Sequence, residues 1–340
     1  MSQLRVALVA TVLNEYGSLP CWIQGLALQR RLPDECVIVD GGSTDGTVEY
    51  LQSQPFPFPC RILQVPGAGI AAGRNIAIEA VTADAIVVTD AGTRAEADWL
   101  QRLIEPFESR PEVDLVAGFF KPVTGDVWTQ TLAAATLPEP EDVELRTFLP
   151  SSRSVAFRKR WFEAGFRYPE WLDYCEDLVF DLQLRQANAS QITRIDAVVS
   201  FQPRGSLLQF IRQYFRYARG DGKAGLFFRR HLIRYLTYAL GIGVICRRRP
   251  IELLVALLCG SVYLRQSVLR FGRRHPGALR DVHRAPLILA LIALQKAVGD
   301  AAKMVGYPVG LVWRLKTDRS ARFWKTGWRF RRPDGHLRRL

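Results

Sequence analysis

Acidic residues are scarce in the last part of the chain, where residues 204–340 contain six Asp and Glu against 29 Lys and Arg. Residues 1–203 show the opposite balance, with 27 acidic and 17 basic side chains, and the whole chain of 340 residues carries a formal net charge of +13. Such an excess of positive charge indicates an anionic partner, which is nucleic acid, phospholipid or a phosphorylated substrate. We expect this partner to be bound by residues 204–340, because the excess lies there.

Cysteine pair motifs are also missing, and no leader segment is expected. The six cysteines form no Cys-x-x-Cys pair, and the four histidines are scattered through the basic part, so no histidine-based metal site is expected. The chain begins MSQLRVALVATVLNE, where an expected strand leaves no room for a signal peptide. These features favour free thiols in a reducing, cytoplasmic setting.

No apolar run reaches the roughly 20 residues that a membrane-spanning helix needs. Shorter runs occupy Tyr235–Cys246, Ile251–Leu264 and Ala285–Leu294, the last of which extends loosely to Trp313. Arginine clusters flank these runs, and an amphipathic segment with interleaved aromatic and basic residues precedes them at 206–220. This pattern suits anionic lipid and predicts a helical, membrane-associating region over 204–340. A soluble helical domain is the alternative, and the number of membrane crossings is left open.

Residues 1–203 alternate short, continuous apolar runs with helical patterns, which predicts βαβ units around a mostly parallel sheet covered on both faces. Four prolines between 119 and 150 indicate a long loop there. The expected strands are Val6–Ala10, Cys36–Asp40, Arg61–Val65, Ala85–Thr89, Asp114–Gly118, Ser154–Phe157 and Ile192–Phe201, and the expected helices lie near 18–28, 46–53, 70–81, 97–109 and 176–187.

Two polar motifs close the first two expected strands. Thr11-Val12-Leu13-Asn14-Glu15 follows the first, and VIVDGGSTDGT at 37–47 closes the second. Asp40 ends a buried run, so we expect its carboxylate to face the crevice at the carboxyl edge of the sheet, where it suits a ribose or a base. Gly41 and Gly42 permit a sharp turn, whereas residues 43–45 are mainly explained by turn and cap chemistry.

A Gly-rich stretch, PGAGIAAGRN, follows the third expected strand at 66–75. Gly67, Gly69 and Ala72 match the dinucleotide fingerprint G-x-G-x-x-G/A, but that fingerprint belongs to the first βαβ unit. Arg74 does not suit a plain dinucleotide loop and suits a charge-assisted contact with a diphosphate. A surface arginine on a helix is the alternative.

Carboxylates occur at two further positions. Asp90 ends the fourth expected strand and is followed by small residues, so it can hold a hard divalent cation against phosphate oxygens. A helix cap or a paired carboxylate is the alternative for Asp90. Glu176 and Asp177 begin an expected helix, where the helix dipole favours acidic residues in any case.

These motifs in this order resemble the family 2 glycosyltransferases, which have the GT-A fold. The resemblance spans about residues 4–220 and rests on VIVDGGSTDGT with Asn14-Glu15 upstream, GAGIAAGRN, the strand-end Asp90 and the downstream Glu176-Asp177 pair. It implies a catalytic domain over 1–203 that transfers a sugar, with inversion, from a nucleotide-diphosphate sugar.

The resemblance also implies residue roles. Thr11 and Asp40 would contact the nucleobase, and Glu15, next to Asn14, the ribose region. Arg74 would lie near the base and the diphosphate. Asp90 would bind Mg²⁺ or Mn²⁺ as the metal-binding aspartate of the D-x-D motif. Asp177 would be the general base, with Glu176 beside it, and Gln213, Arg216 and Tyr217 are similar to the Q-x-x-R-W motif of processive members.

Two departures from the family pattern matter. The D-x-D motif reads Asp90-Ala91-Gly92, so its second carboxylate is missing and weaker metal dependence is expected. Tyr217 stands in place of tryptophan, and no long array of spans follows, which favours single transfer over processive synthesis. The expected acceptor is a hydroxyl of a lipid-linked or polysaccharide glycan of the cell envelope.

Three other classes of protein remain as alternatives. A non-catalytic nucleotide-sugar-binding subunit would explain the incomplete D-x-D motif, and a nicotinamide-dependent oxidoreductase would explain the match at Gly67–Ala72. A nucleic-acid binder would explain the basic residues, but the apolar runs between the arginine clusters favour membrane lipid over nucleic acid. The catalytic domain is expected on the cytoplasmic face of a membrane.

Overall fold

The structure, a computed structural model, describes residues 4–317, 330–331 and 337–338. The described residues divide into two compact units. The first contains residues 4–123, 144–202, 330–331 and 337–338, and the second contains 124–143 and 203–317. Each unit has a hydrophobic core of its own.

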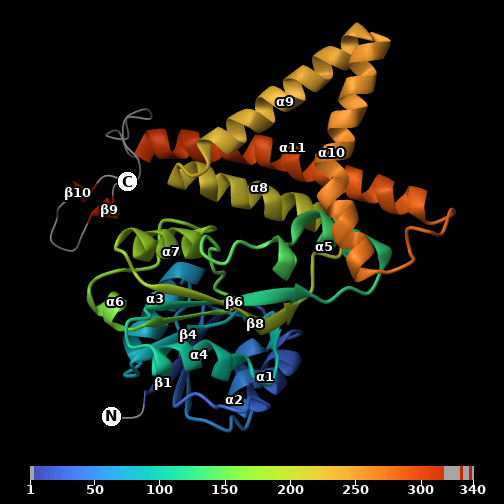
Figure 1. The fold of residues 1–340 in the computed structure, drawn as a ribbon. Coiled ribbons are helices and arrows are strands. Elements are labelled where there is room, and N and C mark those ends of the chain that lie inside the picture. The colour runs from blue at the N-terminus through green and yellow to red at the C-terminus, as the bar shows by residue number, and fades with distance from the viewer. Residues whose placement is uncertain (1–3, 318–329, 332–336, 339–340) are drawn as a thin grey trace. The chain divides into compact units, whose positions relative to one another are not determined.

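The first unit is built on an eight-stranded mixed sheet in the order β3-β2-β1-β4-β7-β6-β8-β5 (Figure 1). Strands β3, β2, β1 and β4 run parallel, and β6 and β8 also pair in parallel. Strands β7 and β5 are antiparallel to their neighbours. The strands are β1 (Val6–Val12), β2 (Glu35–Asp40), β3 (Cys60–Gln64), β4 (Ala85–Val88), β5 (Thr93–Ala95), β6 (Leu115–Pro122), β7 (Val155–Arg158) and β8 (Gln191–Phe201).

Helices cover both faces of this sheet, as the continuous apolar strands predicted. Alternate residues of β1 enter two different cores: Leu8 packs with Trp22 and Trp99 on one face, whereas Val9 packs with Ile78 and Phe180 on the other. The helices are α1 (Leu19–Ala27), α2 (Thr47–Ser53), α3 (Ile70–Ala80), α4 (Trp99–Ser109), α6 (Arg160–Glu163) and α7 (Glu176–Gln186).

The prediction of a long loop over 119–150 is wrong. Strand β6 continues to Pro122, helix α5 covers Val127–Thr136, and a short 3-10 helix, η1, covers Pro140–Asp142. The Asp126 side chain accepts a hydrogen bond from the Thr129 N–H and begins α5 with a capping box. The prolines that suggested a loop lie outside α5, and the helix buries an apolar face within the second unit.

The second unit is helical. Phe271, Ile288 and Ile292 form its small core with Ala134 of α5. Helices α10 and α11 are long and apolar enough to cross a membrane by length and composition. Of the most apolar stretch of each helix, 6% is buried in α10 and 33% in α11. Its long helices are α8 (Leu207–Ala224), α9 (Phe228–Arg247), α10 (Pro250–Arg274) and α11 (Ala285–Thr317), and β9 (Phe330–Arg331) and β10 (Leu337–Arg338) form a separate two-stranded ribbon.

Candidate active site

Hydrogen bonds join the loops that follow β1 and β2. The backbone N–H of Asn14 donates to the Ser43 hydroxyl at 2.8 Å, and the Asn14 side-chain oxygen accepts from the Thr44 N–H at 2.9 Å. The N–H of Glu15 donates to Oγ1 of Thr47 at 2.9 Å. The motifs at 11–15 and 37–47 therefore form one surface at the carboxyl edge of the parallel strands.

Asp40 ends β2 and is 1% exposed. Its carboxylate accepts hydrogen bonds from the N–H groups of Gly42 at 2.9 Å and Ser43 at 3.0 Å, and from the Ser43 hydroxyl. The side chain thus shapes its own loop and does not stand open in a crevice, because the sharp turn brings two N–H groups within its reach. Asp45 supports the same turn by accepting from the Thr47 N–H at 3.1 Å.

The Gly-rich loop after β3 packs against the loop after β2. The N–H groups of Val65 and Gly67 donate to the carbonyl oxygens of Asp40 and Gly41 at 2.8 and 2.9 Å. A Cβ on Gly41 would lie 2.8 Å from the Ala68 carbonyl oxygen, so this close approach requires glycine. The loop follows β3 at the edge of the sheet.

The first turns of α3 contact the end of β1. A Cβ on Gly73 would lie 2.7 Å from Cγ2 of Thr11, so glycine lets the helix approach the strand. Arg74 follows directly and is 2% exposed, which excludes the alternative of a surface arginine. Thr11 itself is half-buried at the same edge.

Arg74 links two carboxylates that lie 86 positions apart in the sequence. Its Nη2 donates to Oδ1 of Asp90 at 2.9 Å, after β4, and its Nη1 donates to Oε1 of Glu176 at 2.6 Å, at the start of α7. The guanidinium carbon lies 5.3 Å from the centre of the Tyr168 ring. One buried cation therefore holds the end of a central strand against the start of a helix.

Burial raises the pKa of Glu176 to about 7, the charge of Asp177 adds to this effect, and Arg74 offsets it only in part. For Arg74 burial acts to lower the pKa, but the charges of Asp90 and Glu176 outweigh burial and raise the pKa further above its usual value. Burial, with the charge of Asp177, also raises the pKa of Asp181 well above its usual range. Glu176 can therefore gain or lose a proton near neutral pH beside a permanent cation.

Asp177 lies in the first turn of α7, partly exposed, next to the buried Glu176. Its carboxylate accepts from the Leu178 N–H at 2.8 Å and from the Ser152 N–H at 3.4 Å. Cys175, which precedes the helix, has a φ of 68° and turns the chain sharply at this point. The Glu176 carboxylate is thus bound to Arg74, whereas the Asp177 carboxylate is accessible to solvent.

This combination of sheet order and strand-end motifs has a counterpart among known proteins. Residues 8–166 match the family model described as Glycosyl transferase family 2. This part of the chain is a family 2 glycosyltransferase domain. The matched residues contain Thr11, Asp40, Arg74 and Asp90, and the match ends before Glu176. The chain is a glycosyltransferase, and its first unit has the GT-A type of fold.

Two solved structures have similar folds. One is a crystal structure of S. aureus TarS 1–349 in complex with UDP-GlcNAc, with a TM-score of 0.51, 16% sequence identity, and coverage of 99% of this chain and 97% of that chain. The other is the mannosyltransferase PcManGT from Pyrobaculum calidifontis in complex with GDP-Man and Mn²⁺, with a TM-score of 0.52, 16% identity, and coverage of 92% and 88%. At these identities the likeness supports the fold alone. No curated protein matched the sequence.

The surroundings of Asp90 in the glycosyltransferase fit a divalent cation held by one carboxylate. Oδ1 of Asp90 is taken by Arg74, whereas Oδ2 lies 3.9 Å from Nε of Arg153, and the side chain is 32% exposed. Mg²⁺ commonly takes one or two protein carboxylates beside substrate phosphates and water, so Oδ2 suits such an ion. Within residues 4–317 no group of three or more His, Cys, Asp or Glu side chains is placed to hold a metal ion.

Two residues of the site were not predicted from the sequence. Arg153 precedes β7 outside any motif, and its position beside Asp90 follows only from the pairing of β7 with β4. Asn75 follows Arg74, and its side chain donates to the Tyr168 carbonyl at 2.9 Å and accepts from the Tyr168 N–H at 3.0 Å. The sequence signal that could have indicated Asn75 was its position directly after Arg74 in the Gly-rich stretch.

Gln213, Arg216 and Tyr217 lie on α8 of the second unit of the glycosyltransferase. Gln213 Nε2 donates to the Tyr217 hydroxyl at 2.8 Å, one helical turn away, and the Tyr214 ring lies 5.9 Å from that of Tyr217. Arg216 is exposed. Gln213 and Tyr217 thus form one hydrogen-bonded pair on the helix.

Proposed function

We propose that this glycosyltransferase moves a sugar from a nucleotide-diphosphate sugar to an acceptor hydroxyl, with inversion at the anomeric carbon. The observation that carries the proposal is the buried Arg74, which joins the strand-end Asp90 to Glu176, next to the partly exposed Asp177. A cation and several carboxylates at the carboxyl edge of parallel strands suit a diphosphate and a sugar hydroxyl.

The donor nucleoside is proposed to bind against the joined loops of β1 and β2, through Thr11, Asn14 and Glu15, with the buried Asp40 holding the β2 loop in shape. The hydrogen bonds among these loops support this role because they fix the loop surface before a ligand binds. Both end nitrogens of Arg74 are taken by carboxylates, so we propose that Arg74 acts on the diphosphate by its charge and by its hold on Asp90.

In the proposed reaction the acceptor oxygen attacks the anomeric carbon while the Asp177 carboxylate takes its proton. The bond from that carbon to the diphosphate oxygen breaks, and the nucleotide diphosphate leaves with the electron pair. A single displacement inverts the configuration of the carbon. General-base help of this kind typically contributes about 10²–10⁴-fold.

A divalent cation, Mg²⁺ or Mn²⁺, held at Asp90 would offset the negative charge that develops on the leaving diphosphate. Arg74 and Arg153 already place two positive charges beside Asp90, one of them fully buried. We therefore propose that the protein binds its donor with a weaker dependence on metal than a site with two aspartates would show.

The ligands bound in the two similar structures support this class of donor. The TarS complex contains UDP-GlcNAc, and the PcManGT complex contains GDP-Man and Mn²⁺. We propose a hexose or hexosamine nucleotide as the donor on this basis and leave the sugar and the base to experiment.

The acceptor is proposed to be a lipid-linked or polysaccharide glycan of the cell envelope. Region 204–340 would associate with membrane lipid, and the catalytic domain, residues 1–203, would face the cytoplasm. Gln213, Arg216 and Tyr217 would contact the acceptor or its phosphate. The basic charge of this region and the two apolar helices that pass the length test support the membrane part of the proposal.

A panel of nucleotide sugars, each with and without Mn²⁺, tests the proposal by thermal stabilisation and by hydrolysis of the donor. We expect one donor to raise the melting temperature and to be hydrolysed slowly without acceptor. Stabilisation without turnover, with or without an acceptor extract, would instead support a non-catalytic binding subunit, which the Asp90-Ala91-Gly92 sequence favours. A panel with no stabilising donor would contradict both.

A further inference from the structure

Helices α9 and α10 form a hairpin (Figure 1). Large apolar side chains are exposed along most of its length. The exposed fraction is 71% for Leu240 on α9 and 79% for Ile251 on α10. Other exposed apolar residues on the hairpin include Leu236, Ile242, Ile245, Leu254, Leu257 and Val262. An apolar surface of this extent marks an interaction site.

These side chains do not lie on one face of either helix. Leu240 and Ile242 are both exposed and point roughly 160° apart on a helix of 3.6 residues per turn. Ile251 and Leu257 on α10 are both exposed and point roughly 120° apart. A helix that lies flat on a membrane keeps a polar face toward water, whereas a helix that is apolar all round requires an apolar environment on every side.

Positive charge bounds the apolar stretch at both ends. Arg247, Arg248 and Arg249 occupy the tip of the hairpin, and Arg265 follows the apolar stretch of α10. Arg234, which precedes the apolar stretch of α9, is paired with Asp300 at 2.9 Å. Within the described residues, neither Arg247 nor Arg248 has an ion-pair partner, whereas Arg249 pairs with Glu252 at 3.4 Å. Unpaired guanidinium groups at the edge of an apolar surface are complementary to the phosphates of a lipid bilayer.

The apolar stretch is shorter than the hydrocarbon core of a bilayer, and of its two helices α10 is the one that is long and apolar enough to cross by length and composition. Residues 235–246 of α9 span roughly 18 Å and residues 250–264 of α10 roughly 22 Å at 1.5 Å per residue. The hydrocarbon core is about 30 Å thick. Long arginine side chains that extend toward the headgroups, and local thinning of the bilayer, offset the difference.

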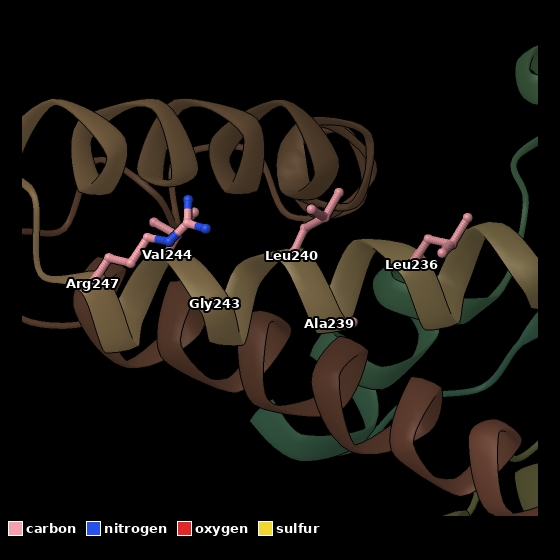
Figure 2. A pocket seen from close by; sticks show the side chains of 6 residues that line it. All are labelled: Leu236, Ala239, Leu240, Gly243, Val244 and Arg247. Atoms are coloured by element: carbon pink, nitrogen blue, oxygen red, sulfur yellow. The ribbon is translucent and has the colours of Figure 1, made fainter.

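A groove of about 270 Å³ runs along one side of α9. Figure 2 shows the residues that line it, with the aliphatic Leu236, Leu240 and Val244 along the helix and the Arg247 guanidinium at the end near the tip. Ala239 and Gly243 also line it and contribute little or no side chain. An apolar groove that ends in a cation fits an acyl chain whose phosphate headgroup meets the arginine.

We propose that the α9–α10 hairpin inserts into a bilayer that contains anionic phospholipid. The apolar stretches lie in the hydrocarbon, and Arg247–Arg249 reach the phosphates of the far leaflet. This inference rests on the membrane association proposed above and does not depend on sugar transfer.

The first test is flotation of the full-length chain with vesicles of phosphatidylcholine alone or with phosphatidylglycerol. The variant Leu240→Gln/Ile251→Gln/Val262→Gln changes three exposed side chains, and we expect its binding to fall at least about tenfold because burial in lipid of each is favourable. Arg247→Gln/Arg248→Gln should lose the preference for phosphatidylglycerol. The matched control Leu28→Gln/Leu32→Gln/Leu145→Gln changes exposed apolar residues of the first unit and should bind as the wild type does.

The second test measures depth in reconstituted vesicles with an environment-sensitive fluorophore on single exposed cysteines. Cys259 lies within the apolar stretch of α10, Cys246 lies next to the tip, and Cys21 lies on the first unit. We expect acyl-chain nitroxides to quench the fluorophore at Cys259, headgroup nitroxides to quench it at Cys246, and neither to quench it at Cys21.

Three results would overturn the insertion. The first is that the triple Gln variant floats as well as the wild type, and the second is that the fluorophore at Cys259 stays in water on bound protein. The third is that the wild type forms a dimer without lipid and that the triple Gln substitution abolishes this dimer. The last result would assign the apolar surface to a second copy of the chain. Stabilisation by a nucleotide sugar should survive in every hairpin variant, so failure of the donor panel is distinguishable from failure of these tests.

Discussion

Asp177 and Glu176 are adjacent, yet the fold gives them different surroundings. Glu176 is buried against Arg74, whereas Asp177 is partly exposed and bound by backbone N–H groups of Ser152 and Leu178. We expect Asp177→Asn to lower kcat by about 10²–10⁴-fold because the amide cannot accept the acceptor proton. Donor affinity, measured by calorimetry, should change little. Turnover at the normal rate in this variant would remove Asp177 as the base.

Glu176 leads to a prediction about pH. Burial and the charge of Asp177 raise the pKa of Glu176 from 4.5 to about 7 in the folded protein. The folded state therefore holds this proton more tightly than the unfolded state, so the contribution of Glu176 to stability is fully present below pH 4.5 and is lost as pH rises through about 7. Urea unfolding at pH 5 and pH 8 should show the wild type losing stability relative to Glu176→Gln over this range. The exposed Glu79→Gln variant is the matched control, and a difference that does not vary with pH would contradict the assignment.

At the residue scale the sequence did not predict the orientation of the charged side chains. Asp40 and Arg74 were both expected to face a ligand, but the structure buries both and satisfies them with protein groups. Burial of Arg74 depends on Gly73, which lets α3 approach β1, and on Glu176, which is 102 positions away along the chain. Contacts of this range arise from tertiary packing, so a linear motif does not contain them.

The contact of α3 with β1 allows a test at the scale of elements. A Cβ on Gly73 would lie 2.7 Å from Cγ2 of Thr11, so Gly73→Ala should push the helix away from the strand. We expect a loss of about 1–3 kcal/mol in unfolding free energy, typical of overpacking, and weaker donor stabilisation because Arg74 moves with the helix. Gly17→Ala, at a position with open space, is the control for urea unfolding. Equal stability of the two variants would show that the helix yields without cost.

Strands and helices with continuous apolar runs were predicted to within a few residues, and those without such runs were missed. Strand β5 has three residues, of which one is buried, and pairs only with the distant β8. Helix α5 was hidden by prolines that in fact flank it, and by an Ala-rich face whose burial depends on α10 and α11. The sheet is also more mixed than expected, because β7 enters antiparallel between β4 and β6.

For the whole molecule, the division of charge predicts how vesicle binding responds to salt. The screening length falls from about 10 Å at 0.1 M to about 3 Å at 1 M, which removes most of the attraction between arginine and anionic headgroups. The apolar contribution does not weaken with salt in this way. We expect the bound fraction in flotation assays to fall at 1 M salt and to level off well above zero. Complete release would indicate a purely electrostatic surface contact.

Arg74 has a further consequence for the free protein. Its guanidinium is planar and its two end nitrogens reach different carboxylates, whereas a lysine offers a single ammonium and would serve one or the other. The buried side chain thus fixes the distance between Asp90, at the end of β4, and Glu176, at the start of α7. Arg74→Lys would keep the positive charge but would contact only one of the two carboxylates. The distance between the end of β4 and the start of α7 would then no longer be fixed by this side chain, although the local charge would be unchanged.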